Sequence, residues 1–245
     1  MIVRINSVDT PYWKKDMDAV VPQKPGMLLL PKTGCAKDIL EADAYLTQLE
    51  EKLGFEPNTV GLMALIETAM GVENAFAIAT AAKRVRALFL GAEDLTADLQ
   101  CKRTKEGREI EYARTRLVVA ARAAGIAVYD TPFTDVNDDE GIWTDARYAK
   151  SLGFNGKASI SPRHVEAINS VFSPTMKEIE YAYEVMDAIE LAKKQGKGAI
   201  ALHGKMIDAP IVARAQQTIA AVVKQAKRSA SNRISLPFLA VLTIS

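Results

Sequence analysis

The sequence predicts an α/β fold in which helices wrap a parallel sheet. Short apolar runs that end at polar or proline residues alternate with longer segments whose apolar residues recur at helical spacing. The connections between them are short for most of the chain, which is typical of strand–helix units that build a parallel sheet. Six such units are found. The pattern alone leaves open a closed barrel, which needs eight strands, or a doubly wound sheet.

Each expected strand is a short apolar run followed by a polar residue or a proline. The six runs cover residues 2–6, 27–30, 61–68, 86–94, 126–130 and 153–160. Apolar runs of this length with polar boundaries are typical of strands that are buried on both faces of a parallel sheet. Pro31 ends the second run, because a proline cannot sit in the interior of a sheet.

The expected helices fill the intervals between these runs. They cover residues 12–21, 36–53, 69–83, 109–124 and 138–152. The second of them is strongly amphipathic, with its apolar residues on one side. Gly54 and Gly125 follow the second and fourth helices and fit the glycine that often ends a helix.

The character of the chain changes after about residue 172. Two long helices are expected at residues 175–195 and 210–227, and the segment between them contains a short hairpin. We therefore divide the chain into a barrel-like part at residues 1–172, a helical segment at residues 173–228 and a tail at residues 229–245. The tail receives no role.

Composition excludes several classes of partner and location. The net charge is +1, with 49% hydrophobic and 25% charged residues, so neither nucleic acid nor a membrane surface is an expected partner. No apolar run reaches the length of a membrane span. Cys35 and Cys101 are too few for a disulfide framework or a zinc site, and we expect cytosolic thiols in a cytoplasmic protein. The first residues resemble a strand, so no secretory leader is expected.

Two carboxylates, Glu67 and Asp94, are the first candidates for a functional site. Each follows one of two neighbouring strands, so both are expected at the same edge of the sheet. Taken singly, either residue is equally well explained as a helix N-cap or a surface acid. As a pair they are costly to bury without a cation, and we expect a site for a hard cation such as Mg²⁺.

Other strand-end residues are expected at the same edge, where parallel α/β folds bind ligands. These positions are Arg4, Asn6, Pro31, Lys32, Thr68, Glu93, Asp130, Thr131 and residues 159–162. Together they suit an anionic, oxygen-rich substrate bound through a divalent ion, which would act as a Lewis acid on a carbonyl. Alternatives stay open, because Arg4 fits a surface arginine, Lys32 a helix cap or ion pair, and Glu93 a solvated neighbour. His164 and His203 lack a partner at metal-ligand or triad spacing and are expected to be structural.

An ordered set of short motifs resembles the citrate lyase beta subunit-like family of the HpcH/HpaI aldolase superfamily. The motifs lie at residues 3–6, 30–32, 65–69, 90–95, 153–162 and 204–210. The resemblance runs from about residue 3 to about residue 220, and the ordered set is far more specific than any one motif.

The resemblance implies a Mg²⁺-dependent TIM-type (β/α)₈ barrel that acts on a 3-hydroxy-acyl-CoA thioester. Citryl-, malyl- or citramalyl-CoA would be cleaved to acetyl-CoA and a 2-oxo acid. The family's metal ligands match Glu67 and Asp94, and its catalytic, substrate-binding arginine matches Arg4. The other residues to which the resemblance gives a substrate-binding role are Lys32, Glu67, Ala92, Glu93 and Pro132.

The resemblance also implies an oligomer and a C-terminal lid. Asp208 matches a catalytic aspartate that, in several relatives, reaches a neighbouring subunit's active site, so a homotrimer or hexamer is expected. The substrate would be an acyl-CoA or an acyl-carrier-protein thioester.

Relatives in this family carry two further strand–helix units before the strand that matches residues 3–6. We therefore expect an incomplete barrel of six parallel units with a helical lid, and such an open sheet would expose two apolar edges. Other readings stay open: a malyl- or citramalyl-CoA thioesterase, a synthase that uses the same site, or an inactive truncated homologue that serves as a subunit.

Overall fold

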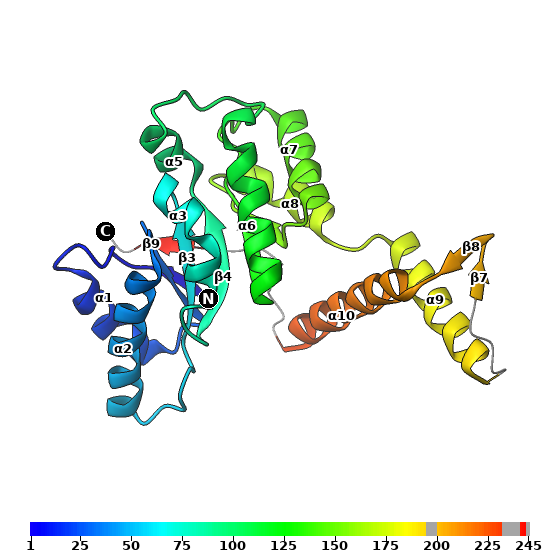
Figure 1. The fold of residues 1–245 in the computed structure, drawn as a ribbon, viewed down its shortest axis with the longest axis horizontal. Coiled ribbons are helices and arrows are strands. Elements are labelled where there is room, and N and C mark those ends of the chain that lie inside the picture. Colours follow the sequence, from blue (N-terminus) through cyan, green and yellow to red (C-terminus); the bar gives the residue numbers. More distant parts are fainter. Residues whose placement is uncertain (195–199, 232–240, 244–245) are drawn as a thin grey trace. The chain divides into compact units, whose positions relative to one another are not determined.

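The computed structural model describes residues 1–194, 200–231 and 241–243 (Figure 1). The chain forms two compact units. Unit 1 comprises Met1–Ile168 together with Leu239–Ser245, and unit 2 comprises Asn169–Phe238.

A parallel sheet forms the centre of unit 1. Its strands are β1 (Ile2–Arg4), β2 (Met27–Leu30), β3 (Gly61–Ile66), β4 (Val85–Leu90), β5 (Ala127–Asp130), β6 (Gly156–Lys157) and β9 (Val241–Thr243). They lie in the order β6-β5-β4-β3-β2-β1-β9, and all neighbours are parallel. Strands β1 to β6 follow one another in sequence and form a half-barrel. The predicted fold class, an incomplete TIM-type barrel of six parallel strands, is confirmed.

The tail contributes a strand to this sheet. Strand β9 pairs in parallel with β1, with Val3 opposite Leu242. The expectation that a six-stranded sheet leaves two edges open was therefore wrong at the β1 edge. The backbone groups of β1 on that side have hydrogen-bonding partners in β9, and pairing of this kind removes the hazard of an open edge.

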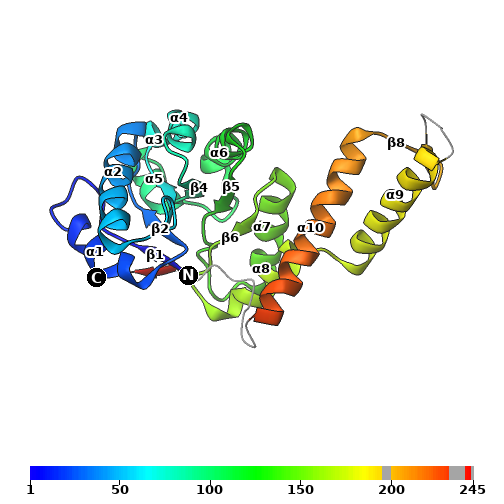
Figure 2. The same ribbon diagram turned by 90° about the horizontal axis from the view of Figure 1, so that it is seen from below.

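Helices connect the strands of unit 1. They are α1 (Trp13–Val20), η1 (Val21–Gln23), α2 (Ala36–Leu53), α3 (Ala69–Glu73), α4 (Ala75–Thr80), α5 (Ala92–Asp98), η2 (Arg108–Ile110), α6 (Glu111–Ala124), α7 (Asp139–Leu152), η3 (Pro162–His164) and α8 (Val165–Phe172), whose end lies in unit 2. Figure 2 shows α2, α4 and α6 along the outer side of the strands. Gly54 and Gly125 end α2 and α6 in the left-handed conformation, as the sequence predicts.

Local structure departs from the sequence prediction at three places. The helix expected at residues 69–83 is broken at Asn74, whose side-chain amide donates to the carbonyl of Gly34 at 2.9 Å. The strand expected at residues 153–160 is reduced to β6, which has two residues. Helices α5 and α8 were not predicted, because both are short; α5 begins just after β4, and α8 follows η3 directly.

Successive residues of β3 pack on opposite faces of the sheet, and both faces are buried. Leu62, Ala64 and Ile66 share one face. Met63 and Leu65 share the other, where they pack with residues of β1, β2 and β4. Residues two apart on a strand share a face. Glu67 therefore continues the face of Met63 and Leu65 just beyond the end of β3.

Unit 2 is a pair of antiparallel helices with a small hairpin. Helix α9 (Met176–Lys194) leads to β7 (Ile200–Leu202) and β8 (Lys205–Ile207), which pair antiparallel and confirm the predicted hairpin, and α10 (Ala209–Ser231) follows. Ala182 and Val185 of α9 are buried against Ile207 and Ala215, so the two helices share a core. Among the helices that the structure describes, none is both long and apolar enough to cross a membrane.

A buried ion-pair cluster joins the beginning of β4 to α2. Arg84 and Glu50 are each 2% exposed, and their side chains pair through Nη1 and Oε1 at 3.0 Å. The guanidinium also donates to Asp43 and to the carbonyl of Val60, while Glu50 accepts the amides of Asn58 and Val60. Burial raises the pKa of Glu50, but Arg84 and the two amides outweigh it and leave that pKa below its ordinary value. The cluster therefore fixes the loop that precedes β3.

Replacing Arg84 with leucine should destabilise unit 1 strongly. The change leaves Glu50 buried without its cation, and removal of one partner from a buried pair costs about 3–5 kcal/mol. Urea unfolding followed by tryptophan fluorescence measures this, because both tryptophans, Trp13 and Trp143, lie in unit 1.

Lys83→Leu is the matched control, since Lys83 is an exposed cation directly before Arg84 in the chain. It should change the free energy of unfolding by less than about 1 kcal/mol. Equal effects of the two substitutions would contradict a stabilising role for the Arg84 cluster.

Candidate active site

The two candidate carboxylates lie at the carboxyl ends of adjacent strands. Strands β3 and β4 are parallel, with Ile66 opposite Leu90, so the chain leaves the sheet at Glu67 and Gly91 side by side. Asp94 does not stand at the strand end itself, as the sequence pattern indicated, but in the first turn of α5. The structure nevertheless brings the Asp94 carboxyl into a side-chain hydrogen bond with Glu67.

Glu67 is enclosed by backbone atoms. It is 3% exposed, and its Oε1 accepts the backbone amide of Lys32 at 2.7 Å. A Cβ atom on Gly91 would lie 2.8 Å from both Cβ and Oε2 of Glu67. Residue 91 must therefore be glycine, because the side chain of Glu67 occupies the space that a Cβ would need. The sequence signal of Gly91 was too weak to interpret alone.

The surroundings of Glu67 favour its protonated form. Burial raises the pKa of the Glu67 carboxyl to about 7, and the charge and hydrogen bond of Asp94 act in the same direction. The amide of Lys32 and the charge of Arg4 act against this shift. Because the pKa of Glu67 lies near neutrality, its carboxyl can release a proton when a cation binds beside it.

Lys32 contributes its backbone to this site. Its φ angle is +50°, in the left-handed region that residues with side chains seldom adopt, and this turn directs the amide at Glu67. The side chain of Lys32 is exposed. The structure thus assigns the contact with Glu67 to the amide of Lys32 rather than to its ammonium group.

Arg4 is the last residue of β1 and is half-buried. Its guanidinium is near enough to Glu67 to lower the pKa of that carboxyl. Arg4 therefore lies on the same edge of the sheet as Glu67, where the sequence placed it, and can attract a second anion.

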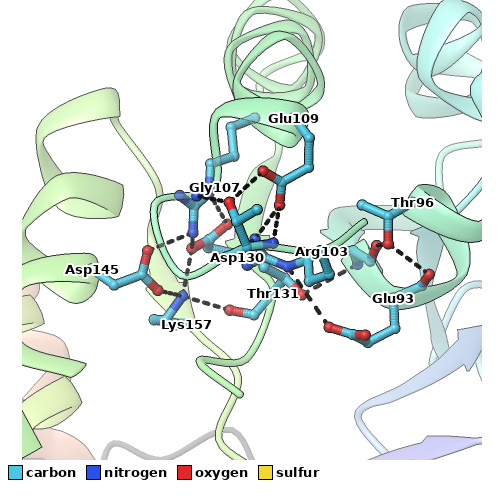
Figure 3. A network of polar contacts seen from close by, with 12 residues as sticks. Glu93, Thr96, Arg103, Gly107, Glu109, Asp130, Thr131, Asp145 and Lys157 are labelled. Carbon is cyan, nitrogen blue, oxygen red and sulfur yellow. Dashed lines mark hydrogen bonds and ion pairs between the residues drawn. The ribbon is translucent and has the colours of Figure 1, made fainter. Parts of the chain in front are cut away.

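The remaining expected substrate-binding residues follow β4 and β5. Ala92 is 1% exposed, and its amide donates to Oγ1 of Thr131 at 3.2 Å, which brings the first turn of α5 next to the segment that contains Pro132. Glu93 is exposed, and its Oε1 lies 3.7 Å from Nε of Arg103 (Figure 3). These contacts place Ala92, Glu93 and Pro132 around one strand edge.

A buried cluster of charges behind this edge was missed by sequence reasoning. Asp130 accepts two hydrogen bonds from Arg114, at 3.0 and 2.9 Å, and one from Lys157 at 2.7 Å (Figure 3). Asp145 pairs with the same two cations, at 2.8 Å and 2.5 Å. We call these four residues the buried tetrad. The signal available in the sequence was the placement of Arg114 at helical spacing from Leu117, Val118 and Ala121, which puts an arginine on the apolar side of that helix.

Asp208 lies in unit 2, directly before α10. Its carboxylate is exposed and accepts the amide of Ile211 at 3.1 Å, which is the geometry of a helix N-cap. Of the two histidines, His203 is exposed and pairs with Glu184 at 2.8 Å, whereas His164 is fully buried beside the ring of Phe133.

The donor set at the edge of the sheet fits a small hard cation. Glu67 and Asp94 supply carboxylate oxygens, and Mg²⁺ is commonly held by only one or two carboxylates together with water and substrate oxygens. Across the described residues there is no cluster of three or more histidine, cysteine or acidic side chains that could hold a metal. A cation here would therefore depend on further oxygens from water or substrate.

Comparison with known proteins identifies the family. The family model HpcH/HpaI aldolase/citrate lyase matches residues 1–162. The chain is 43% identical over 219 residues to the citrate lyase subunit beta of Leuconostoc mesenteroides subsp. cremoris, covering 89% of this chain and 72% of that protein. It is 34% identical over 245 residues to the L-malyl-CoA/beta-methylmalyl-CoA lyase of Cereibacter sphaeroides, covering 92% and 76%.

A solved structure supports the same relationship. CitE from Mycobacterium tuberculosis, in complex with magnesium, acetoacetate and coenzyme A, superposes with a TM-score of 0.69 at 27% identity, covering 91% of this chain and 78% of that chain. The resemblance stated from the ordered motifs is thus confirmed. The protein belongs to the HpcH/HpaI aldolase/citrate lyase family.

Proposed function

We propose that this protein is a Mg²⁺-dependent carbon–carbon lyase that cleaves a 3-hydroxy-acyl-CoA thioester to acetyl-CoA and a 2-oxo acid. Citryl-, malyl- and citramalyl-CoA are the candidate substrates. The proposal is supported by the relatives, which are named as citrate lyase beta subunits and a malyl-CoA lyase. The single observation that carries it is the buried Glu67 carboxyl hydrogen-bonded to Asp94 at the carboxyl edge of the sheet.

Glu67 and Asp94 would hold the magnesium ion. When bound, the ion supplies Lewis-acid stabilisation of negative charge on the substrate oxygens. Glu67 is restrained by the amide of Lys32 and by contact with Gly91, so its carboxylate needs little rearrangement on binding. The relative that was solved with magnesium and coenzyme A supports this choice of ion.

Arg4 would bind the carboxylate of the oxo-acid portion. Its guanidinium lies on the same edge as Glu67, and guanidinium–carboxylate pairs are strong and well oriented. In the cleavage, the 3-hydroxyl loses its proton, the bond between that carbon and the thioester α-carbon breaks, and the α-carbon gains the electron pair and then a proton. Backbone around Lys32, Ala92, Glu93 and Pro132 would line the pocket for the acid.

Asp208 is the proposed acid–base residue for the α-carbon. Its carboxylate is exposed beside the start of α10, so it is accessible to a substrate. Following the family resemblance, we propose that it serves a neighbouring copy in a homo-oligomer. The cytoplasmic location expected from the two cysteines stays a prediction.

Magnesium binding should depend on both carboxylates. Glu67→Gln keeps an oxygen for the amide of Lys32 and Asp94→Asn keeps the shape of the side chain, but each removes an ionic ligand. We expect each variant to bind Mg²⁺ at least tenfold more weakly in isothermal titration, the order of effect seen on disturbing a metal site.

Glu93→Gln is the matched control for this titration, because Glu93 is an exposed carboxylate in the same helical turn. It should leave the affinity within about twofold. If wild type and both site variants titrate alike, the metal site is not at Glu67 and Asp94.

The metal-free protein should lose stability as the pH rises. The pKa of Glu67 is raised from its ordinary value to about 7, so its contribution to stability is present below about pH 4.5 and is lost as the pH passes 7. We expect urea unfolding with a chelator present to give a free energy lower by roughly 1–3 kcal/mol at pH 8 than at pH 5.

In Glu67→Gln this contribution should vanish, because the amide does not titrate. The informative quantity is the difference between wild type and variant at each pH, which cancels other titrating groups. Parallel pH profiles for the two proteins would contradict the raised pKa of Glu67.

Turnover of candidate thioesters should distinguish a lyase from its alternatives. Incubation with citryl-, malyl- and citramalyl-CoA should release a 2-oxo acid and acetyl-CoA, whereas free thiol without oxo acid would indicate a thioesterase. Asp208→Asn keeps the N-cap geometry but not the base, and we expect a loss of at least about 100-fold in kcat.

Asp187→Asn serves as control, since Asp187 is an exposed aspartate of α9 in the same unit. Its turnover should equal that of wild type. Unchanged turnover in Asp208→Asn would remove Asp208 from the mechanism.

A further inference from the structure

Helix α5 begins without a side-chain cap of its own. The first amides of a helix have no partner within the helix, and the residue before the first turn usually supplies a side-chain oxygen for them. Here that residue is Gly91, which has no side chain. No capping residue fits in its place, because a Cβ would lie 2.8 Å from two atoms of Glu67.

Thr131 supplies the missing acceptor from another strand. Its Oγ1 accepts the amide of Ala92, the first residue of α5, at 3.2 Å. Thr131 follows the end of β5 directly and is 2% exposed, so this hydrogen bond is shielded from water. A neighbouring strand thus caps the helix that carries Asp94.

The position of Thr131 is in turn fixed by the buried tetrad. Lys157 donates to the carbonyl of Thr131 at 2.6 Å and to Asp130 at 2.7 Å. Lys157 and Arg114 are at most 2% exposed, and Arg114 holds Asp130 through two hydrogen bonds. Figure 3 shows Thr131 between Lys157 on one side and Glu93 and Thr96 of α5 on the other.

We propose that Thr131 is a positioning residue for the metal site: its hydroxyl holds the first turn of α5 so that Asp94 meets Glu67. The inference rests on the proposed function for its metal and substrate. Asp94 lies two residues beyond Ala92 and is exposed apart from its contact with Glu67, so its place depends on the turn that carries it. The first turn of α5 must therefore be held in place, and the hydroxyl of Thr131 attaches it to the segment that follows β5.

The experiment compares Thr131→Val with Thr131→Ser. Valine keeps the shape of threonine but accepts no hydrogen bond, whereas serine restores the hydroxyl. In metal-free protein, hydrogen exchange of the amides at residues 92–95 should be about five- to tenfold faster in Thr131→Val, as expected for loss of one hydrogen bond, and near wild type in Thr131→Ser. Mg²⁺ affinity by isothermal titration should fall about tenfold in the valine variant and recover in the serine variant.

Thr96→Val is the matched control within the same helix. Thr96 is buried, and its hydroxyl donates only to carbonyls of α5 itself, those of Ala92 and Glu93. This variant should bind Mg²⁺ within about twofold of wild type, which separates a general weakening of α5 from the loss of its connection to β5.

The outcomes distinguish this inference from the proposed function. Faster exchange together with weaker, serine-rescued Mg²⁺ binding supports it. Unchanged exchange overturns it, and so does faster exchange with unchanged Mg²⁺ affinity, which would make Thr131 a helix cap and nothing more. If wild type takes up no Mg²⁺, the proposed metal site fails, and the positioning role falls with it even where exchange confirms that Thr131 holds the turn.

Discussion

The cost of burying charge explains how the carboxyl edge of this half-barrel is built. Two acidic side chains there are almost fully buried, Asp130 and Glu67, but their surroundings differ. Asp130 is paired with a guanidinium and an ammonium, which offset the cost of burying its charge. Glu67 accepts one backbone amide and faces another carboxyl, and its pKa is raised to about 7. The first arrangement is complete without a ligand, and the second favours a cation.

Close packing around Glu67 has consequences that reach neighbouring elements. The glutamate excludes a side chain at Gly91, and Lys32 adopts a left-handed backbone conformation to present its amide. The positive φ strains Lys32, and Gly91 offers no side-chain acceptor to the first amides of α5. For α5 the acceptor comes from outside the segment, from the hydroxyl of Thr131. Strain of this kind persists only where the surrounding structure enforces it, and it is often found near functional sites.

Sequence reasoning predicted the candidate site residues but not the contacts that support them. The alternation of apolar runs and helical segments predicted six parallel strands. The polar residues after those strands pointed to Arg4, Glu67 and Asp94. Both signals lie within short stretches of sequence and can therefore be read from the sequence alone. The buried tetrad joins residues as far apart as Arg114 and Lys157, and no periodicity records such a pairing. The start of α5 was missed for the same reason, since its cap lies on β5 rather than in the preceding residues. Strand β9 could not be predicted, because its partner, β1, lies at the other end of the chain.

The two buried ion-pair clusters of unit 1 occupy opposite ends of the strands. Arg84 stands before β4 and joins α2 to the loop that enters β3, whereas Asp130 stands at the end of β5. In parallel barrels the amino ends of the strands serve stability and the carboxyl ends carry function. The tetrad departs from that division, since it stabilises but lies on the functional side. The ammonium group of Lys157 donates both to Asp130 and to the carbonyl of Thr131. The charge cluster is therefore connected, through Thr131 and Ala92, to the helical turn that carries Asp94. At this edge the residues that stabilise the interior are therefore in direct contact with those that support the candidate site.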